Sequence, residues 1–162
     1  MSIFSAPTEF NDAGATVRPL GSWLNFRNLQ IPKFAIISLV ELKIVSATAG
    51  NGFYNSTFFV QITAHKDLNS EITHSEYINP ADRTESCVLW QVPEPWVFEA
   101  EQNVNVTSVV QEIINLNQWS IGKKIKFFID FRSGTGTRHS FKTAYGFSGA
   151  TSPRLEVTWA AQ

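Results

Sequence analysis

Apolar and polar residues alternate in four short segments of the chain, and these segments predict β-strands. They are residues 40–44, 58–64, 124–131 and 154–159. Because successive side chains of a strand point to opposite faces, each segment predicts a half-buried antiparallel strand with one dry and one wet face. The inward-facing residues of these strands make up the predicted core: Val40, Leu42, Ile44, Phe58, Val60, Ile62, Ile125, Phe127, Ile129, Leu155, Val157 and Trp159.

Turn-forming residues separate the predicted strands. Clusters of Gly, Asn, Ser and Pro occur at 50–52, 93–95, 133–136 and 146–153. These residue types favour the tight backbone conformations that turns require. Many short strands divided by such turns are typical of a sandwich of two sheets. We therefore expect one all-β domain over residues 23–162.

One segment has the periodicity of a helix instead. The apolar residues of 107–116 are spaced as on one helical face, and Ser108 and Gln111 have the spacing of a capping box. We expect one short helix here that closes an end of the sandwich, with a structural role. Its apolar residues are Val109, Val110, Ile113 and Ile114.

Residues 1–22 have no clear periodicity and contain two Pro and two Gly residues. This composition predicts an extended N-terminal arm ahead of the sandwich. Such a segment is ordered only when something anchors it. Ile3, Phe4 and Phe10 are the residues that could anchor it to its own domain or to a partner, and an unanchored tail is the equal alternative.

Length and charge exclude several classes of protein. The 162 residues provide one domain with a sizeable core. The net charge of −1 argues against nucleic acid as the main partner, and the basic residues Lys123, Lys124 and Lys126 are interpreted as a solvated strand edge. The N-terminus does not resemble a signal peptide, and no apolar segment is long enough to span a membrane.

No catalytic or metal-binding motif is visible in the sequence. Cys87 is the single cysteine, which excludes an intrachain disulfide, and we expect it to be packed and inert. The nucleophile motifs of hydrolases are absent. His65, His74 and His139 are scattered without metal-ligand spacing. We therefore expect no enzymatic activity, no metal and no cofactor.

Aromatic residues are the remaining candidates for function. The chain contains 13 Phe, 5 Trp and 3 Tyr. Flat rings stack on sugars and anchor protein interfaces when they are exposed, although packing in the core is the commoner role. Trp96 and Trp119 lie near predicted strand ends or loops, and they are our candidates for stacking on a glycan, with Asn117 and Gln118 as orienting polar groups.

Four segments, in the same order, resemble the DNRLRE-type domains. Residues 26–43 (FRNLQIPKFAIISLVELK) resemble the two opening strands, and 106–115 (VTSVVQEIIN) resemble that family's helix. Residues 121–125 (IGKKI) are similar to its Gly-preceded strand, and 152–159 (SPRLEVTW) to its closing strand. The resemblance spans about residues 23–160. It implies an antiparallel jelly-roll β-sandwich.

The resemblance also implies function. Such domains are non-catalytic modules of bacterial surface and secreted proteins, and similar jelly rolls decorate the capsids of tailed phages. Because the sequence shows an arm and no signal peptide, our leading hypothesis is a phage capsid decoration or cement protein on the capsid exterior. It would be a homotrimer that contacts the major capsid protein, without nucleic acid or membrane partners. The alternative is an extracellular carbohydrate-binding module or tail adhesin that recognises a host surface polysaccharide.

Overall fold

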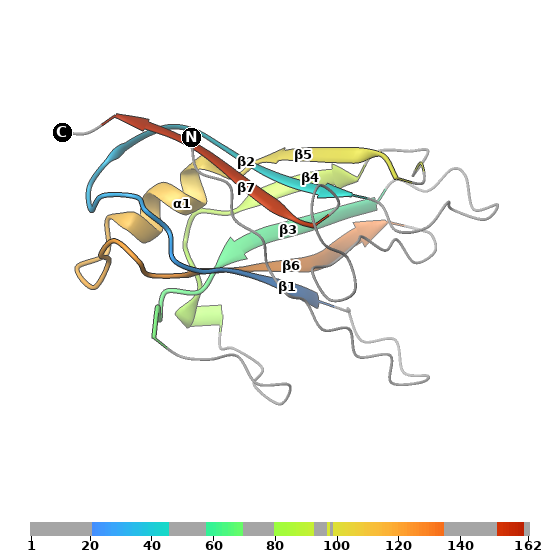
Figure 1. Cartoon of the computed structure of the whole chain (residues 1–162). Coiled ribbons are helices and arrows are strands. Elements are labelled where there is room, and N and C mark those ends of the chain that lie inside the picture. Colours follow the sequence, from blue (N-terminus) through green and yellow to red (C-terminus); the bar gives the residue numbers. More distant parts are fainter. Residues whose placement is uncertain are drawn as a thin grey trace.

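The computed structural model describes residues 21–45, 58–69, 80–92, 97, 99–134 and 152–160 (Figure 1). The first strand begins two residues ahead of the start expected for the domain. The elements in chain order are β1 (Gly21–Phe26), β2 (Ile36–Val45), β3 (Phe58–Ala64), the 3-10 helix η1 (Pro80–Asp82), β4 (Val88–Val92), β5 (Glu101–Asn105), α1 (Thr107–Ile114), β6 (Ile125–Gly134) and β7 (Arg154–Ala160).

The strands form two antiparallel sheets. Among the described residues, one sheet has four strands in the order β1-β6-β3-β4, and the other has three in the order β5-β2-β7. Every strand pair is antiparallel. The predicted all-β sandwich with one short helix is therefore confirmed.

The core lies between the sheets, where the alternation of apolar residues placed it. Ten of the twelve predicted core residues are buried. Trp159 is partly buried and packs against the core. The side chain of Phe58 lies outside the described part of the chain. Within the core, the rings of Phe26 and Phe127 from the neighbouring strands β1 and β6 meet edge to face, with their centroids 5.9 Å apart.

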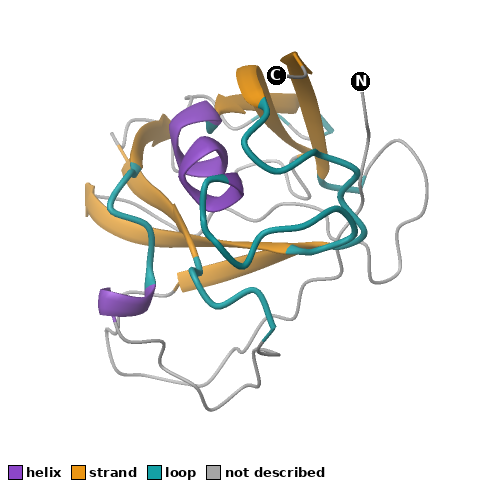
Figure 2. Cartoon of the chain, turned by 90° about the vertical axis from the view of Figure 1, so that its left-hand side faces the viewer, coloured by secondary structure: helices purple, strands orange, loops and turns teal. Residues whose placement is uncertain are grey.

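Helix α1 closes one end of the sandwich, as predicted. It packs against β2 of one sheet and β3 of the other, and Figure 2 views the molecule from this end. The predicted apolar face is the buried face. No helix in the described ranges is long and apolar enough to span a membrane.

The predicted capping box of α1 is wrong. The N-cap residue is Val106, and no side chain caps the helix. Gln111 instead directs its side-chain amide at β2, where Oε1 accepts a hydrogen bond from the Ile37 N–H. The Gln111 side chain therefore serves the backbone at the start of β2 instead of the first turn of its own helix.

The outer face of β6 is covered, which the alternation did not predict. Lys126 has no exposed surface, and Phe128 on the same face is also buried. The guanidinium of Arg83 lies over the Phe128 ring, 4.3 Å from its centroid, and pairs with Asp130. The interpretation of Lys126 as part of a solvated strand edge is therefore wrong, because β6 is an interior strand with β1 on one side and β3 on the other.

Candidate functional site

Of the apolar and aromatic residues proposed as contact sites from the sequence, Trp119 alone falls within the described residues, together with its proposed polar neighbours Asn117 and Gln118. Ile3, Phe4 and Phe10 of the arm, and Trp96, lie outside the described residues. Trp119 is described, but it is only 2% exposed, and its indole Nε1 donates a hydrogen bond to the Ile31 carbonyl at 3.0 Å. A ring held in this way cannot stack on a sugar, so the prediction for Trp119 is wrong.

Two loops meet where β1 ends and β6 begins. The last register pair of these strands is Phe26 with Ile125. Beyond that pair, the Leu29 N–H donates to the Lys123 carbonyl at 3.0 Å, and the Gly122 N–H donates to the Leu29 carbonyl at 2.8 Å. Gly122 has φ of +88°, a conformation that glycine adopts without strain. These backbone contacts hold the two loops together.

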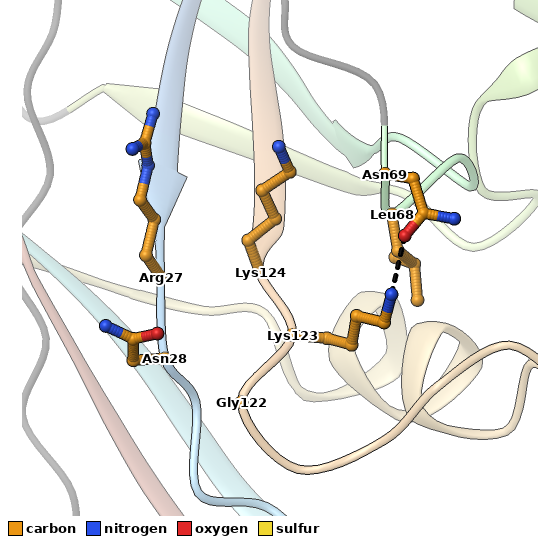
Figure 3. Close-up of a pocket in the computed structure, with 7 residues that line it drawn as sticks. All are labelled: Arg27, Asn28, Leu68, Asn69, Gly122, Lys123 and Lys124. Carbon is orange, nitrogen blue, oxygen red and sulfur yellow. Dashed lines mark hydrogen bonds between the residues drawn. The ribbon is translucent and has the colours of Figure 1, made fainter.

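An open depression of about 260 Å³ lies on this junction. We call it the basic depression, because three of its lining residues are cationic, two are amides and none is acidic. Figure 3 shows the side chains of Arg27, which follows β1, and Lys124, which precedes β6, extending alongside each other. The lining residues are Arg27, Asn28, Leu68, Asn69, Gly122, Lys123 and Lys124.

The third cation is held in position by the loop that follows β3. The Lys123 Nζ donates a hydrogen bond to the Asn69 Oδ1 at 2.5 Å (Figure 3). The Asn69 N–H in turn donates to the Asp67 Oδ1 at 2.9 Å. Cationic side chains gathered in a hollow raise the local concentration of anions.

The sequence did not reveal this site. Lys123 and Lys124 are adjacent in the sequence, where they predict only a solvated strand edge. Arg27 lies far away along the chain and reaches them only because β1 pairs with β6. The signal that could have found the site is the strand pairing, which a single sequence does not give.

A second surface carries exposed apolar side chains at the start of β2. We call Phe34, Ile36 and Leu39 the β2 apolar patch. Ile36 is 57% exposed, and the other two are also exposed. On β7, Ala160 is the register partner of Ile36 and Thr158 that of Leu39, and both are exposed as well. Exposed apolar side chains grouped in this way are characteristic of contact surfaces.

Charged residues follow the patch along the same sheet. Lys43 lies 2.9 Å from Glu156 and 3.7 Å from Glu101, and Arg154 also pairs with Glu101. The hydrogen bond with Glu156 raises the pKa of Lys43. An apolar patch bordered by charged residues matches the composition of protein interfaces, whose centres are apolar and whose rims are polar.

Other features expected from the sequence can also be located. Cys87 is exposed, so the expectation of a packed thiol is wrong. In the part of the chain that the structure describes, no three His, Cys, Asp or Glu side chains converge as in a metal site.

No model of a known protein family matches the chain, and no curated protein matches it. The resemblance to DNRLRE-type domains therefore depends on the four sequence segments alone.

Proposed function

We propose that the chain is a non-enzymatic virion protein that decorates or cements the capsid of a tailed phage. The observation that carries this proposal is the β2 apolar patch with its charged border. A protein that acts by adhesion needs a surface of this kind. The resemblance to jelly rolls of phage virions supplies the location, the capsid exterior.

The mechanism is adhesion by a rigid body. Burial of a large apolar side chain contributes roughly 1.5–3 kcal/mol, so a patch of three such residues gives an interface of modest strength. A homotrimer on the capsid would repeat the contact with each subunit, and simultaneous engagement multiplies weak affinities. Closed symmetry also leaves no contact unsatisfied. Sister subunits and the major capsid protein are the partners in this mechanism, and the arm residues Ile3, Phe4 and Phe10 add contacts along the capsid.

The alternative function is a carbohydrate-binding module or tail adhesin that recognises a surface polysaccharide. Burial of Trp119 removes one of its two proposed stacking residues. Trp96 remains the candidate for that role, so a Trp96→Ala variant that folds and no longer binds host polysaccharide would favour the alternative.

The test compares two isoleucines that are equally exposed. Ile36 in the β2 apolar patch and Ile121 in the loop before β6 are each 57% exposed. Purified Ile36→Glu and Ile121→Glu variants are added to undecorated particles of the phage that encodes the chain, and bound copies are counted by gel densitometry. Light scattering of each free protein gives its oligomeric state.

We expect Ile36→Glu to lower particle occupancy by about tenfold or more, because a carboxylate would be desolvated in the contact. Ile121→Glu should bind like the unmodified chain. Equal occupancy for both variants would remove the patch from the mechanism, and no binding by the unmodified chain would reject the capsid function.

A further inference from the structure

We propose that Phe34 anchors the contact of the β2 apolar patch by inserting its ring into an apolar pocket of the capsid subunit, beside a carboxylate that pairs with Lys33. This assignment rests on the capsid function proposed above. It names the residue that dominates the contact and the chemistry of the surface that receives it. Its basis is the backbone conformation of Phe34, the exposure of its ring and the charge of its neighbour.

Phe34 has a backbone conformation that does not suit a bulky side chain. It is the third residue of a turn over residues 32–35, which is closed by a hydrogen bond of 3.3 Å from the Ala35 N–H to the Pro32 carbonyl. Its φ is +60°, and no other residue of this turn has a positive φ. Type II turns have a positive φ at this position and normally place glycine or asparagine there. Phenylalanine is strained in this conformation because its Cβ crowds the backbone.

Packing of the ring explains little of this choice of residue. Phe34 is 45% exposed, whereas Ala35 beside it is buried and Trp119, an aromatic residue of the core, is 2% exposed. A strained residue that keeps so much contact with solvent contributes little to the stability of the fold. Strained residues cluster at functional sites, where the surrounding structure enforces their conformation. Strain and exposure together therefore indicate that the ring serves a contact with another molecule.

The C-terminal end of α1 and the segment after it hold the turn in position. The Phe34 N–H donates a long hydrogen bond of 3.5 Å to the Ile114 carbonyl. The Lys33 Nζ donates to the Asn117 carbonyl at 2.7 Å. Because the fold fixes the turn in this way, the ring is in place before a partner arrives. Binding then requires little further ordering of the protein, which favours affinity.

The charge beside the ring indicates what the partner offers. The Lys33 ammonium lies 4.8 Å from the centroid of the Phe34 ring. Within the described residues no carboxylate pairs with Lys33, whereas Lys43 and Arg154, farther along the sheet, pair with glutamates. A partner that covers the ring also covers part of the ammonium, and a charge removed from water needs a counter-charge. A pocket with apolar walls and a carboxylate at its rim satisfies both side chains.

Phe34 is better suited than its neighbours to be the anchor. Binding energy at protein interfaces is concentrated in a few residues that fill pockets, and aromatic residues are enriched at the centres of interfaces. Ile36 and Leu39, the other members of the β2 apolar patch, would surround the ring and exclude water from it. A second copy of the chain is a poorer partner than the capsid subunit, because Glu101 and Glu156 near the patch already pair with cations.

The test measures both stability and binding to undecorated particles. Phe34→Gly removes the ring and relaxes the backbone. Ile121→Gly is its matched control, because Ile121 is 57% exposed and its φ is not positive. Lys33→Gln removes the charge but keeps a donor for the Asn117 carbonyl, and Arg132→Gln removes an exposed charge from β6 in the other sheet. Urea denaturation gives the stability, particle titration at two salt concentrations gives the affinity, and light scattering gives the oligomeric state of each free protein.

We expect Phe34→Gly to unfold at about the same urea concentration as the unmodified chain, because relief of the strained φ offsets the lost packing of the ring and the greater freedom of glycine in the unfolded chain. Ile121→Gly has no strain to relieve and should unfold at a lower concentration. Phe34→Gly should lower the affinity for particles by about tenfold or more. Lys33→Gln should lower it by about threefold and weaken its salt dependence. Both control variants should bind like the unmodified chain.

Three results would overturn the anchor role. They are unchanged affinity in Phe34→Gly, unfolding of Phe34→Gly at a much lower urea concentration than Ile121→Gly, and a free oligomer that Phe34→Gly dissociates, which would assign the ring to a second copy. Unchanged affinity in Lys33→Gln would remove the carboxylate from the pocket. If Ile36→Glu loses affinity and Phe34→Gly does not, the capsid function stands and the anchor role fails. If the unmodified chain does not bind, both fail.

Discussion

Gln111 of α1 holds Ile37 of β2 through its side-chain amide. The Gln111 Oε1 accepts the Ile37 N–H at 2.9 Å, and its Nε2 donates to the Ala35 carbonyl at 3.1 Å. The register of β2 with β7 shifts between Ile37 and Leu39, so the ladder is irregular at this point. The helix therefore supplies hydrogen bonds beside an irregularity of the sheet, and it links the end of the sandwich to the strand that carries the β2 apolar patch.

A Gln111→Leu variant should be less stable because it leaves two part-buried backbone groups without these partners. The expected loss in the free energy of unfolding is about 2–4 kcal/mol, measured by urea denaturation. Gln30→Leu is the control: Gln30 is exposed and bonds only to the nearby Asn28 carbonyl, so its loss should be below about 0.5 kcal/mol. Equal stabilities of the two variants would contradict a bracing role for Gln111.

Trp119 should be needed for stability rather than for ligand binding. Trp119→Ala removes a buried indole and should cost about 3–5 kcal/mol of unfolding free energy. Trp119→Phe keeps an aromatic ring but loses the hydrogen bond to the Ile31 carbonyl, so it should cost less. Thermal or urea unfolding measures both. A Trp119→Ala variant as stable as the unmodified chain would be incompatible with the observed burial.

His65 should make the fold sensitive to mild acid. Burial, followed by the positive charge of Lys126, lowers the pKa of His65 from 6.5, against smaller opposing effects of Asp67 and Asp82. The unfolded chain therefore binds a proton more readily than the folded chain does. The contribution of His65 to stability is present above pH 6.5 and is lost as the pH falls through the lower pKa of the folded state.

The measurement is the urea concentration at half-unfolding, taken at several pH values from pH 8 down to about pH 5. This pH range lies above the pKa values of most carboxylates. The unmodified chain should lose stability as the pH falls through this range. His65→Gln should have a flatter profile because its side chain does not titrate. The same slope in both proteins would show that another group causes the pH dependence.

Deletion of residues 1–20 should spare folding and weaken capsid attachment. The deletion ends just before β1, so every described element of the sandwich remains in the chain. The truncated protein should unfold at nearly the same temperature but occupy fewer sites on undecorated particles, because Ile3, Phe4 and Phe10 are lost. Unchanged occupancy would exclude the arm from attachment, and a large fall in melting temperature would show that it stabilises the sandwich.

Much of the fold could be predicted because alternation and helical spacing report directly on which side chains share a face. Leu42 and Leu155 are buried register partners on β2 and β7, and both were predicted as core. The apolar face of α1 was predicted for the same reason. The capping of α1 was not, because Gln111 serves a strand that is distant in sequence, and local spacing carries no information about that contact.

The candidate sites were harder to predict. Trp119 stands in a segment without periodicity, so the sequence could not show that its ring is buried and its Nε1 satisfied. The basic depression combines Arg27 with Lys123 and Lys124, which come together only through the pairing of β1 with β6.

The sequence by itself determined the class of fold, the inner faces of the strands and the position of the helix, since these depend on interactions between near neighbours in the chain. Only the tertiary structure decided which outer faces are covered. Lys126 and Lys43 both occupy polar positions of strands that lie between two neighbours, yet the Lys126 side chain on β6 is fully buried, whereas that of Lys43 on β2 is partly exposed and pairs with Glu156. Alternation separates the two sides of a strand, but what packs against each side depends on residues far away along the chain.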